Sequence, residues 1–463
     1  MSRIALVLIG LSFAGSVYAQ SPLDSRPGVV HAAESFAQGG AIRLTLSDAI
    51  ARGLDTSHRI AEVKAREEGA RAAAKGAELA NRPILSASAG YSRTNHVEEF
   101  SFPQPDGTFF VAYPDIPNNI LSRVSFQWPI YTSGRTDALE RAAEAEASAV
   151  GAEIDGVRAD LRFEIARAYW AAVTAREAVR VLEESTARAD AQLGDARQRF
   201  KVGLIPPNEV SSLEAQRSRE QAQFFEARNI RESALIDLRR LIGVPYDTVI
   251  DLIDPLEGAQ GAQGAQGAQG AQGAQDLIKN ALESRPERKA MVLRLGGFEA
   301  RQQAALTGNK PTINLTGGVD YANPNPRIFP RQGVWQESWD IGVNLNWNFF
   351  DSGRTKAQAA EASAAVLATR ERIAEFDAVV AADVQQRLLD VDTSHAMVNA
   401  ARDAVRSAAE ARRVVADRFA AGVATSTDVL VAQVALLEAE LVRTRSLAGV
   451  RLAEARLERV LGR

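Results

Sequence analysis

The feature that most restricts how this chain folds is a long segment without helix breakers. Residues Arg354 to Ala421 contain neither glycine nor proline. In the corresponding part of the first half, apolar residues recur every three or four positions with charged residues between them: Val150, Ile154, Val157, Leu161 and Ile165. This spacing predicts a continuous helix of roughly 65 residues, about 100 Å long. Such a helix is too long for a compact globule.

The chain consists of two copies of one unit. The stretch "PIYTSGRTDA" (129–138) returns as "NFFDSGRTKA" (348–357), and the same offset of 219 residues relates Phe200 to Phe419. Upstream the offset is 228, as between Pro83 and Pro311. The first copy is therefore nine residues longer than the second in a segment rich in proline and asparagine. That segment and its shorter counterpart are predicted exposed loops. We expect repeats over 44–250 and 276–463, joined by a flexible linker over 251–275 that contains six GAQ triplets.

Each copy predicts a helical hairpin, over about 135–243 and 354–462. The turns "RFKVGL" and "RFAAGV" contain Gly203 and Gly422, which can adopt the left-handed conformation that ends a helix. The returning arms are shorter than the long helices. A second helix in each copy, Arg59–Ala80 and Pro286–Gly308, is expected to stack end to end with the returning arm and complete its length.

Before each SGRT the hydrophobic period changes from 3.6 to 2, which predicts strands at about 84–92, 122–131, 313–321 and 339–350. Large apolar residues share one face of these strands: Trp128, Ile341, Val343, Leu345, Trp347 and Phe349. The face contacts either lipid or the core of a half-buried soluble sheet. Four strands cannot close a barrel, so copies of the chain must complete it and a cyclic homo-oligomer is expected; three chains would provide twelve strands.

Composition excludes several classes. Residues 1–19 have a basic start, an apolar run too short for a membrane anchor, and small residues at the end, which predicts a cleavable secretory signal followed by an extension over 20–43. No cysteine is present, so disulfides, thiolate metal sites and cysteine lipidation are excluded. The net charge of −4 gives no footprint for nucleic acid. No metal site, cofactor or catalytic motif such as HExxH, GxSxG or a P-loop is found, so no enzyme is expected.

The signal segment, the duplicated strand–loop–strand–hairpin order, the SGRT junctions and the turns together resemble the TolC family of outer-membrane efflux proteins. The resemblance implies an α+β membrane protein: a trimeric 12-strand outer-membrane β-barrel continued by a periplasmic α-helical barrel. It implies a passive exit duct in the outer membrane of a Gram-negative bacterium, working with a periplasmic adaptor and an inner-membrane transporter. Small-molecule efflux is expected first, type I protein secretion second, and a periplasmic adaptor or coiled-coil scaffold third.

The resemblance also implies roles for the hairpin turns. The adaptor-contact tip would consist of Val202, Gly203, Leu204, Ala421, Gly422 and Val423, although the glycines also suit simple helix ends. Asp428, and less strongly Glu209, are aperture candidates, with an acid that complements the helix dipole as the alternative. Phe419 lacks a hydroxyl and Ala424 lacks a charge, so a gate closed by polar links is not expected here.

The SGRT segments are expected to be joints between the membrane strands and the helices: Ser133, Gly134, Arg135, Ser352, Gly353 and Arg354. Ser133 and Ser352, or Asp351, would cap the new helix, and the glycines would allow the bend. The arginines would start the helix near the membrane surface, close to outer-membrane lipid.

Overall fold

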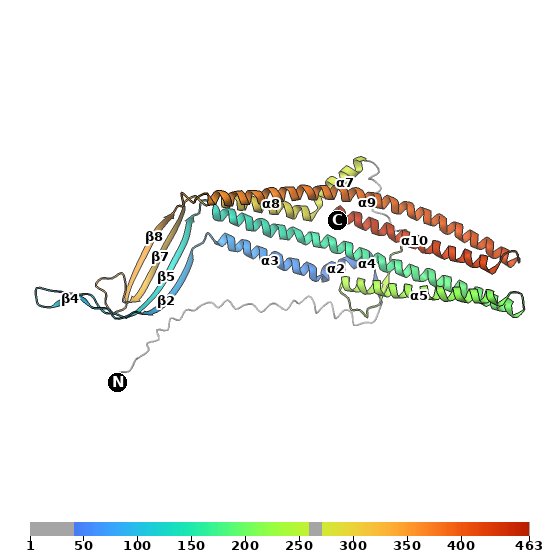
Figure 1. Ribbon diagram of the computed structural model, residues 1–463, viewed down its shortest axis with the longest axis horizontal. Coiled ribbons are helices and arrows are strands. Elements are labelled where there is room, and N and C mark those ends of the chain that lie inside the picture. The colour runs from blue at the N-terminus through green and yellow to red at the C-terminus, as the bar shows by residue number, and fades with distance from the viewer. Residues whose placement is uncertain (1–40, 259–270, 463) are drawn as a thin grey trace, which may run out of the picture.

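The protein is an elongated molecule with a sheet at one end and long helices that extend to the other (Figure 1). The computed structural model describes residues 41–258 and 271–462. The expected signal at 1–19, nearly all of the expected extension and the middle of the GAQ tract lie outside these residues.

The two copies contain the same series of long elements. In the first copy these are α3 (His58–Leu79), β2 (Ile84–Arg93), β5 (Asn118–Tyr131), α4 (Arg135–Lys201) and α5 (Pro207–Ile242). In the second copy they are α8 (Pro286–Ala305), β7 (Thr312–Asn323), β8 (Gln336–Asn346), α9 (Arg354–Ala420) and α10 (Ser426–Val460). Both α4 and α9 are 67 residues long.

The four long strands form one antiparallel sheet in the order β2-β5-β7-β8. Strand β8 ends at Asn346, so Trp347 and Phe349 lie beyond it, contrary to the strand expected over 339–350. The difference has a physical reason. Beyond Gln127, strand β5 continues to Tyr131 through its pairing with β7, whereas β8 is at the edge of the sheet and has no strand on the equivalent side.

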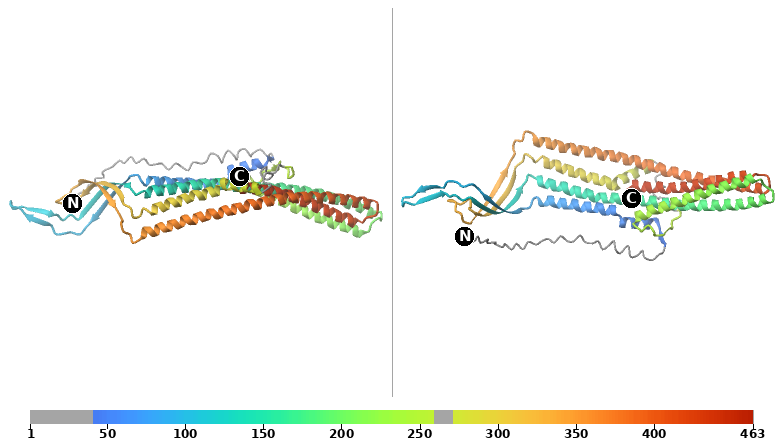
Figure 2. Two further views of the ribbon diagram at one scale, coloured as in Figure 1. Left: turned by 90° about the horizontal axis from the view of Figure 1, so that it is seen from above. Right: turned by 60° about the horizontal axis from the view of Figure 1, so that its bottom comes forward.

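The helices form a layer that continues the order of the strands. Close to the sheet, α4 packs against α3 and α8, and α8 also packs against α9; the right view of Figure 2 shows these four helices side by side. Farther from the sheet, α4 packs against α5 and α10, and α10 packs against α9. Figure 1 shows α3 followed by α5 along α4, and α8 followed by α10 along α9. Two short helices therefore cover one long helix in each copy.

The largest buried cluster lies halfway along the helices, beside the point where α3 gives way to α5. It includes Leu161, Ile165 and Leu238, together with residues of elements that the sequence did not predict. These are β1 (Ile42–Leu44), α2 (Leu46–Thr56) and β6 (Ile250–Leu252), with β1 parallel to β6. The buried Tyr169 hydroxyl lies 3.0 Å from the carbonyl oxygen of Leu44 and 2.9 Å from Oδ2 of Asp254, and burial raises the pKa of Tyr169.

Two expected irregular segments contain regular structure. The linker expected over 251–275 includes the end of β6 and the start of α7 (Ala271–Ser284), because apolar residues of α7 pack against α9 and α10. The exposed loop expected between β2 and β5 contains a hairpin of β3 (Phe100–Pro103) and β4 (Phe109–Tyr113). This hairpin projects beyond the sheet, away from the helices (Figure 1).

Within 41–258 and 271–462, no helix combines the length and the apolar composition needed to cross a membrane.

Candidate functional site

The joint between strand and helix has the same backbone in both copies. Ser133 and Ser352 have φ values of 54° and 55°, and Gly134 and Gly353 have φ values of 80° and 88°. A serine rarely adopts this left-handed conformation, so each joint holds the chain in a strained turn. Helices α4 and α9 begin at the next residue in both copies.

The expected capping by serine is wrong at the first joint. The N-cap residue of α4 is Gly134, which has no side chain to offer, and Ser133 Oγ donates instead to the carbonyl oxygen of Pro311 at 2.6 Å. The positive φ of Ser133 turns its hydroxyl toward the second copy. At the second joint, Asp351 accepts hydrogen bonds from the backbone amides of Gly353 (3.0 Å) and Thr355 (2.8 Å).

One tryptophan at each joint holds it against the end of the preceding short helix. The indole nitrogen of Trp128 donates to the carbonyl oxygen of Asn81, and that of Trp347 donates to the carbonyl oxygen of Asn309, both at 3.0 Å. The sequence offsets of 219 and 228 relate the two bonds. In the sequence these tryptophans stand out only by their apolar rings. The available signal was that Asn81 and Trp128 both recur in the second copy, at offsets of 228 and 219.

One face of the sheet is apolar and uncovered within the chain. The exposed fractions are 42% for Trp128, 63% for Ile341, 66% for Val343 and 62% for Leu345. Beyond β8, Trp347 and Phe349 are 57% and 79% exposed. Exposed apolar surface of this extent indicates contact with another apolar phase or another protein.

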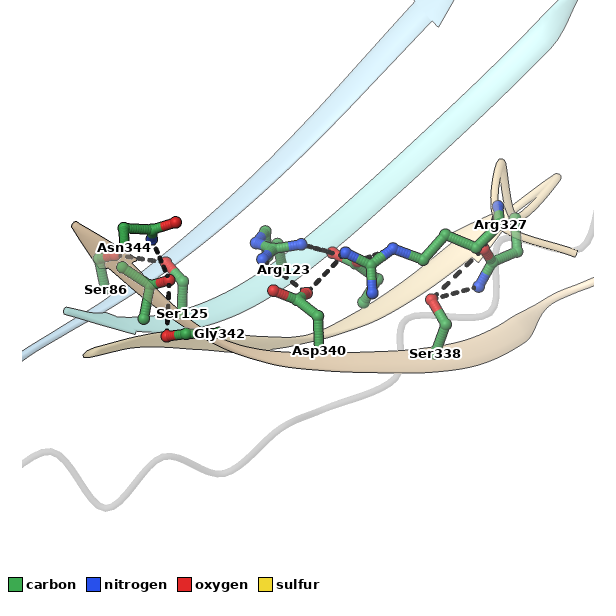
Figure 3. Close-up of polar contacts among 11 residues, drawn as sticks. Ser86, Arg123, Ser125, Arg327, Ser338, Asp340, Gly342 and Asn344 are labelled. Carbon is green, nitrogen blue, oxygen red and sulfur yellow. Dashed lines mark hydrogen bonds and ion pairs between the residues drawn. The ribbon is translucent and has the colours of Figure 1, made fainter. Parts of the chain in front are cut away.

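The other face carries a network of polar side chains (Figure 3). Arg123 of β5 pairs with Asp320 of β7 and Asp340 of β8, each at 2.8 Å, and Arg327 pairs with Asp340 at 2.7 Å. Hydrogen bonds continue the network across the strands: Ser86 with Ser125 at 2.9 Å, and Asn344 with Thr316 at 2.9 Å. Two positive and two negative groups compensate each other, so this face is hydrophilic with little net charge.

The sequence did not lead us to this charged cluster. Asp340 alternates in the sequence with the apolar residues Trp339 and Ile341, but Arg123 and Asp320 lie on two strands whose pairing joins the two copies. The register of β5 against β7 places Arg123 opposite Asp320, and this register is known only from the structure.

The hairpin turns lie at the end of the molecule far from the sheet (Figure 1). Gly203 and Gly422 have φ values of 75° and 73°, and a Cβ atom added at either residue would meet nothing within 4 Å. The flanking Val202, Leu204 and Val423 are 70%, 73% and 64% exposed. Each turn therefore presents bare backbone flanked by aliphatic side chains.

The two aperture candidates have different surroundings. Asp428 forms a capping box at the start of α10: its carboxylate accepts the backbone amide of Thr425 at 2.9 Å, while Thr425 Oγ1 accepts the amide of Asp428 at 3.2 Å. The backbone and hydroxyl hydrogen bonds from Thr425 hold the pKa of Asp428 below its usual range. The residues Thr425 to Asp428 match the Ser/Thr-x-x-acid pattern, a signal that we had not used. Glu209 lies in the first turn of α5, which has no side-chain cap.

A cation–π contact joins the two hairpins near the tip. The guanidinium of Arg199 on α4 lies 4.9 Å from the ring centroid of Phe419 on α9. The contact needs no hydroxyl on residue 419, and the sequence did not predict it.

The described residues include no group of three or more histidine or acidic side chains that could hold a metal ion. The candidate functional residues lie on four parts of the molecule: the joints, the apolar face of the sheet, its polar face and the tip.

Comparisons with known proteins agree with this geometry. A family model described as "Outer membrane efflux protein" matches residues 49–244 and 277–463. The outer membrane protein TolC of Vibrio cholerae is 24% identical over 310 residues, which cover 66% of this chain and 68% of that protein. Protein CyaE of Bordetella pertussis is 25% identical over 249 residues, and the match covers 53% of this chain and 50% of CyaE.

Solved structures share the fold at low sequence identity. The crystal structure of the outer membrane protein VceC from Vibrio cholerae matches with a TM-score of 0.75 at 19% identity, over 90% of this chain and 96% of that one.

Proposed function

Because the chain belongs to the outer membrane efflux protein family, we propose that it is the passive exit duct of a tripartite efflux system. The protein is an outer-membrane channel that extends into the periplasm, and it is not an enzyme. In the proposed assembly, three copies form a twelve-strand barrel that continues as a helical barrel. An inner-membrane transporter supplies small molecules through a periplasmic adaptor.

The observation that carries the proposal is the contrast between the two faces of the sheet. The apolar face suits lipid, since Val343 and Leu345 are largely exposed, and the network of Arg123, Asp320 and Asp340 suits a water-filled lumen. Compensated charge on the lumen side gives a wall that neither attracts nor repels one sign of solute strongly. This favours a duct whose specificity resides in its partners.

The tip is the proposed adaptor contact, formed by Val202, Gly203, Leu204, Ala421, Gly422 and Val423. Bare glycine backbone lets another helix approach closely, and the exposed aliphatic side chains beside it supply apolar area for such a contact. Asp428 remains a candidate for the aperture, and Glu209 a weaker one.

The test combines gene deletion with two complementing variants. Gly422→Trp should restore the oligomer in the outer membrane but not resistance to exported compounds, because the indole would block the adaptor. Gly107→Trp is the matched control, since Gly107 also has a positive φ (81°) and open space around it but lies in the β3–β4 turn at the opposite end. Minimal inhibitory concentrations and secreted proteins are both measured.

Full resistance with Gly422→Trp would exclude the tip assignment. Unchanged resistance of the deletion strain, together with loss of a secreted protein, would replace small-molecule efflux by protein secretion.

A further inference from the structure

The two sequence offsets hold for the strand register. Adding 228 to the residue numbers of β2 and 219 to those of β5 converts the observed pair Ile84–Gln127 into Thr312–Asn346. The structure shows this second pair at the end of the β7–β8 ladder. The residue numbers of a contact in one copy therefore predict which two residues make the equivalent contact in the other copy.

The described chain contains one boundary between the first copy and the second, and we call this boundary the seam. Here β5 pairs with β7, with Val124 opposite Val319, and the Ser133 hydroxyl donates to the Pro311 carbonyl. The equivalent seam would join β8 to β2. These strands lie at opposite edges of the sheet, so they cannot meet within one chain.

The long helices show the missing neighbour directly. Helix α4 has long helical neighbours on each side and buries 24 residues, whereas α9 has the same length, has α8 and α10 on one side and only the short α7 besides them, and buries 7. Large apolar side chains on α9 are left exposed, including Leu367 (56%), Leu389 (61%) and Met397 (59%). On α4, the side facing the second copy is covered by α8 followed by α10. By equivalence, the open side of α9 fits α3 followed by α5 of another copy.

The strand edge gives the same result. Strand β5 pairs with β7 as far as Tyr131, but the equivalent residues after Asn346 are not in a strand. An unpaired strand edge leaves amide and carbonyl groups without partners, which is not tolerated in lipid.

We infer that a second copy of this chain occupies both surfaces in one defined register, with Val343 opposite Tyr91 and Trp347 opposite Ala87 of the neighbouring copy. In the same seam, the Ser352 hydroxyl donates to the neighbour's Pro83 carbonyl. This inference rests on the proposed oligomeric duct and specifies its interface.

Side-chain chemistry agrees with this register. Val343 and Tyr91 are 66% and 64% exposed, and both lie on the apolar face. Asn344 would lie opposite Gly90 on the polar face. A slip of one residue would place an apolar side chain opposite a polar one along the whole edge.

Because the chain has no cysteine, disulfide cross-linking tests the register without background. The double variant V343C with Y91C is oxidised in outer-membrane fractions, heated in SDS and analysed without reductant. We expect the monomer band to be lost into covalent dimers and trimers. The variant V343C with A87C, on the same face but four residues out of register, should remain monomeric, because the two Cα atoms are too far apart for a disulfide.

The equivalent pair within one chain is the positive control. V124C with V319C joins residues that the structure places opposite each other, and it should form a disulfide that leaves the mass monomeric and alters only gel mobility. Cross-links from A87C and not from Y91C would overturn the register while leaving an oligomeric duct. Closure of the control without any intermolecular cross-link would overturn the seam, and the native mass in detergent would then show whether the trimer fails too.

Discussion

The two hairpins end in nearly identical backbone turns, but different side chains start their returning helices. In both turns the amide of the glycine bonds to the carbonyl three residues earlier: Gly203 to Phe200 at 2.9 Å and Gly422 to Phe419 at 3.0 Å. Helix α5 then begins with Pro207 and no side-chain cap, whereas α10 begins with the capping box of Thr425 and Asp428. The two copies therefore share the backbone of the turn but differ in how the returning helix starts.

The interiors of the hairpins differ more. In the first hairpin, the fully buried carboxylate of Glu220 accepts hydrogen bonds from Ser185 Oγ at 2.8 Å and from Gln216 Nε2 at 2.9 Å. The matching residues of the second hairpin are Ala404 and Ala439. A buried polar group with specific partners fixes one alignment of two helices, and an alanine pair does not. The first hairpin therefore has a register marker that the second lacks.

The largest expected effect comes from removing the partner of this buried carboxylate. Ser185→Ala should lower the free energy of local unfolding of the first hairpin by about 1–3 kcal/mol, because Glu220 loses a hydrogen-bond donor while it stays buried. Hydrogen exchange of the purified protein, read on peptides of α4 and α5, measures the change. Ser212→Ala, on the exposed side of α5, is the control and should have little effect. The double variant with Glu220→Ala, which copies the second hairpin, should lose less than the sum of the single variants; additive losses would contradict a coupled pair.

The next effect should be equal in the two hairpins. Gly203→Ala and Gly422→Ala should each destabilise the turn by about 1–2 kcal/mol, because both residues are left-handed and neither has a neighbour that a methyl group would touch. Amide exchange of the two turns measures both. Gly194→Ala, in the interior of α4 with open space around it, should instead stabilise its helix by roughly 0.5–1 kcal/mol. A large difference between the two turn variants would show that the turns are not equivalent.

The smallest effect should be confined to the second hairpin. Thr425→Ala removes the cap of α10 and should cost about 1 kcal/mol of local stability. The pKa of Asp428 is lowered in the folded protein, so its contribution is present above the unfolded pKa and is lost as the pH falls through the folded value, below about pH 4. Amide exchange at the start of α10 should accelerate there relative to that of α5.

Variants of Thr425 and Asp428 distinguish two roles of Asp428: capping α10 and lining the aperture. Asp428→Asn should change the cation selectivity of single channels if three carboxylates face the axis, whereas Thr425→Ala should not. Equal selectivity in wild type and Asp428→Asn would assign Asp428 to the cap alone.

The long elements could be predicted because they follow from local periodicity. Alternation gave the strands that carry Val343 and Leu345, and the absence of breakers gave α9. The elements that were missed depend on distant contacts. Strand β1 is three residues long and exists through its pairing with β6, about 200 residues away, and no local pattern reveals such a pair. The Ser133–Pro311 bond and the Arg123–Asp320 pair likewise require knowledge of how the first copy lies against the second.

The Ser133–Pro311 bond also has a kinetic consequence. It joins two parts of one polypeptide, so it closes in a first-order step at an effective concentration set by the chain itself. In the inferred seam, its counterpart at Ser352 needs a second molecule, so that bond would close at a rate that depends on the concentration of protomers. One contact, written twice in the sequence, thus divides maturation into a concentration-independent stage and a concentration-dependent one. Dilution should delay only the second.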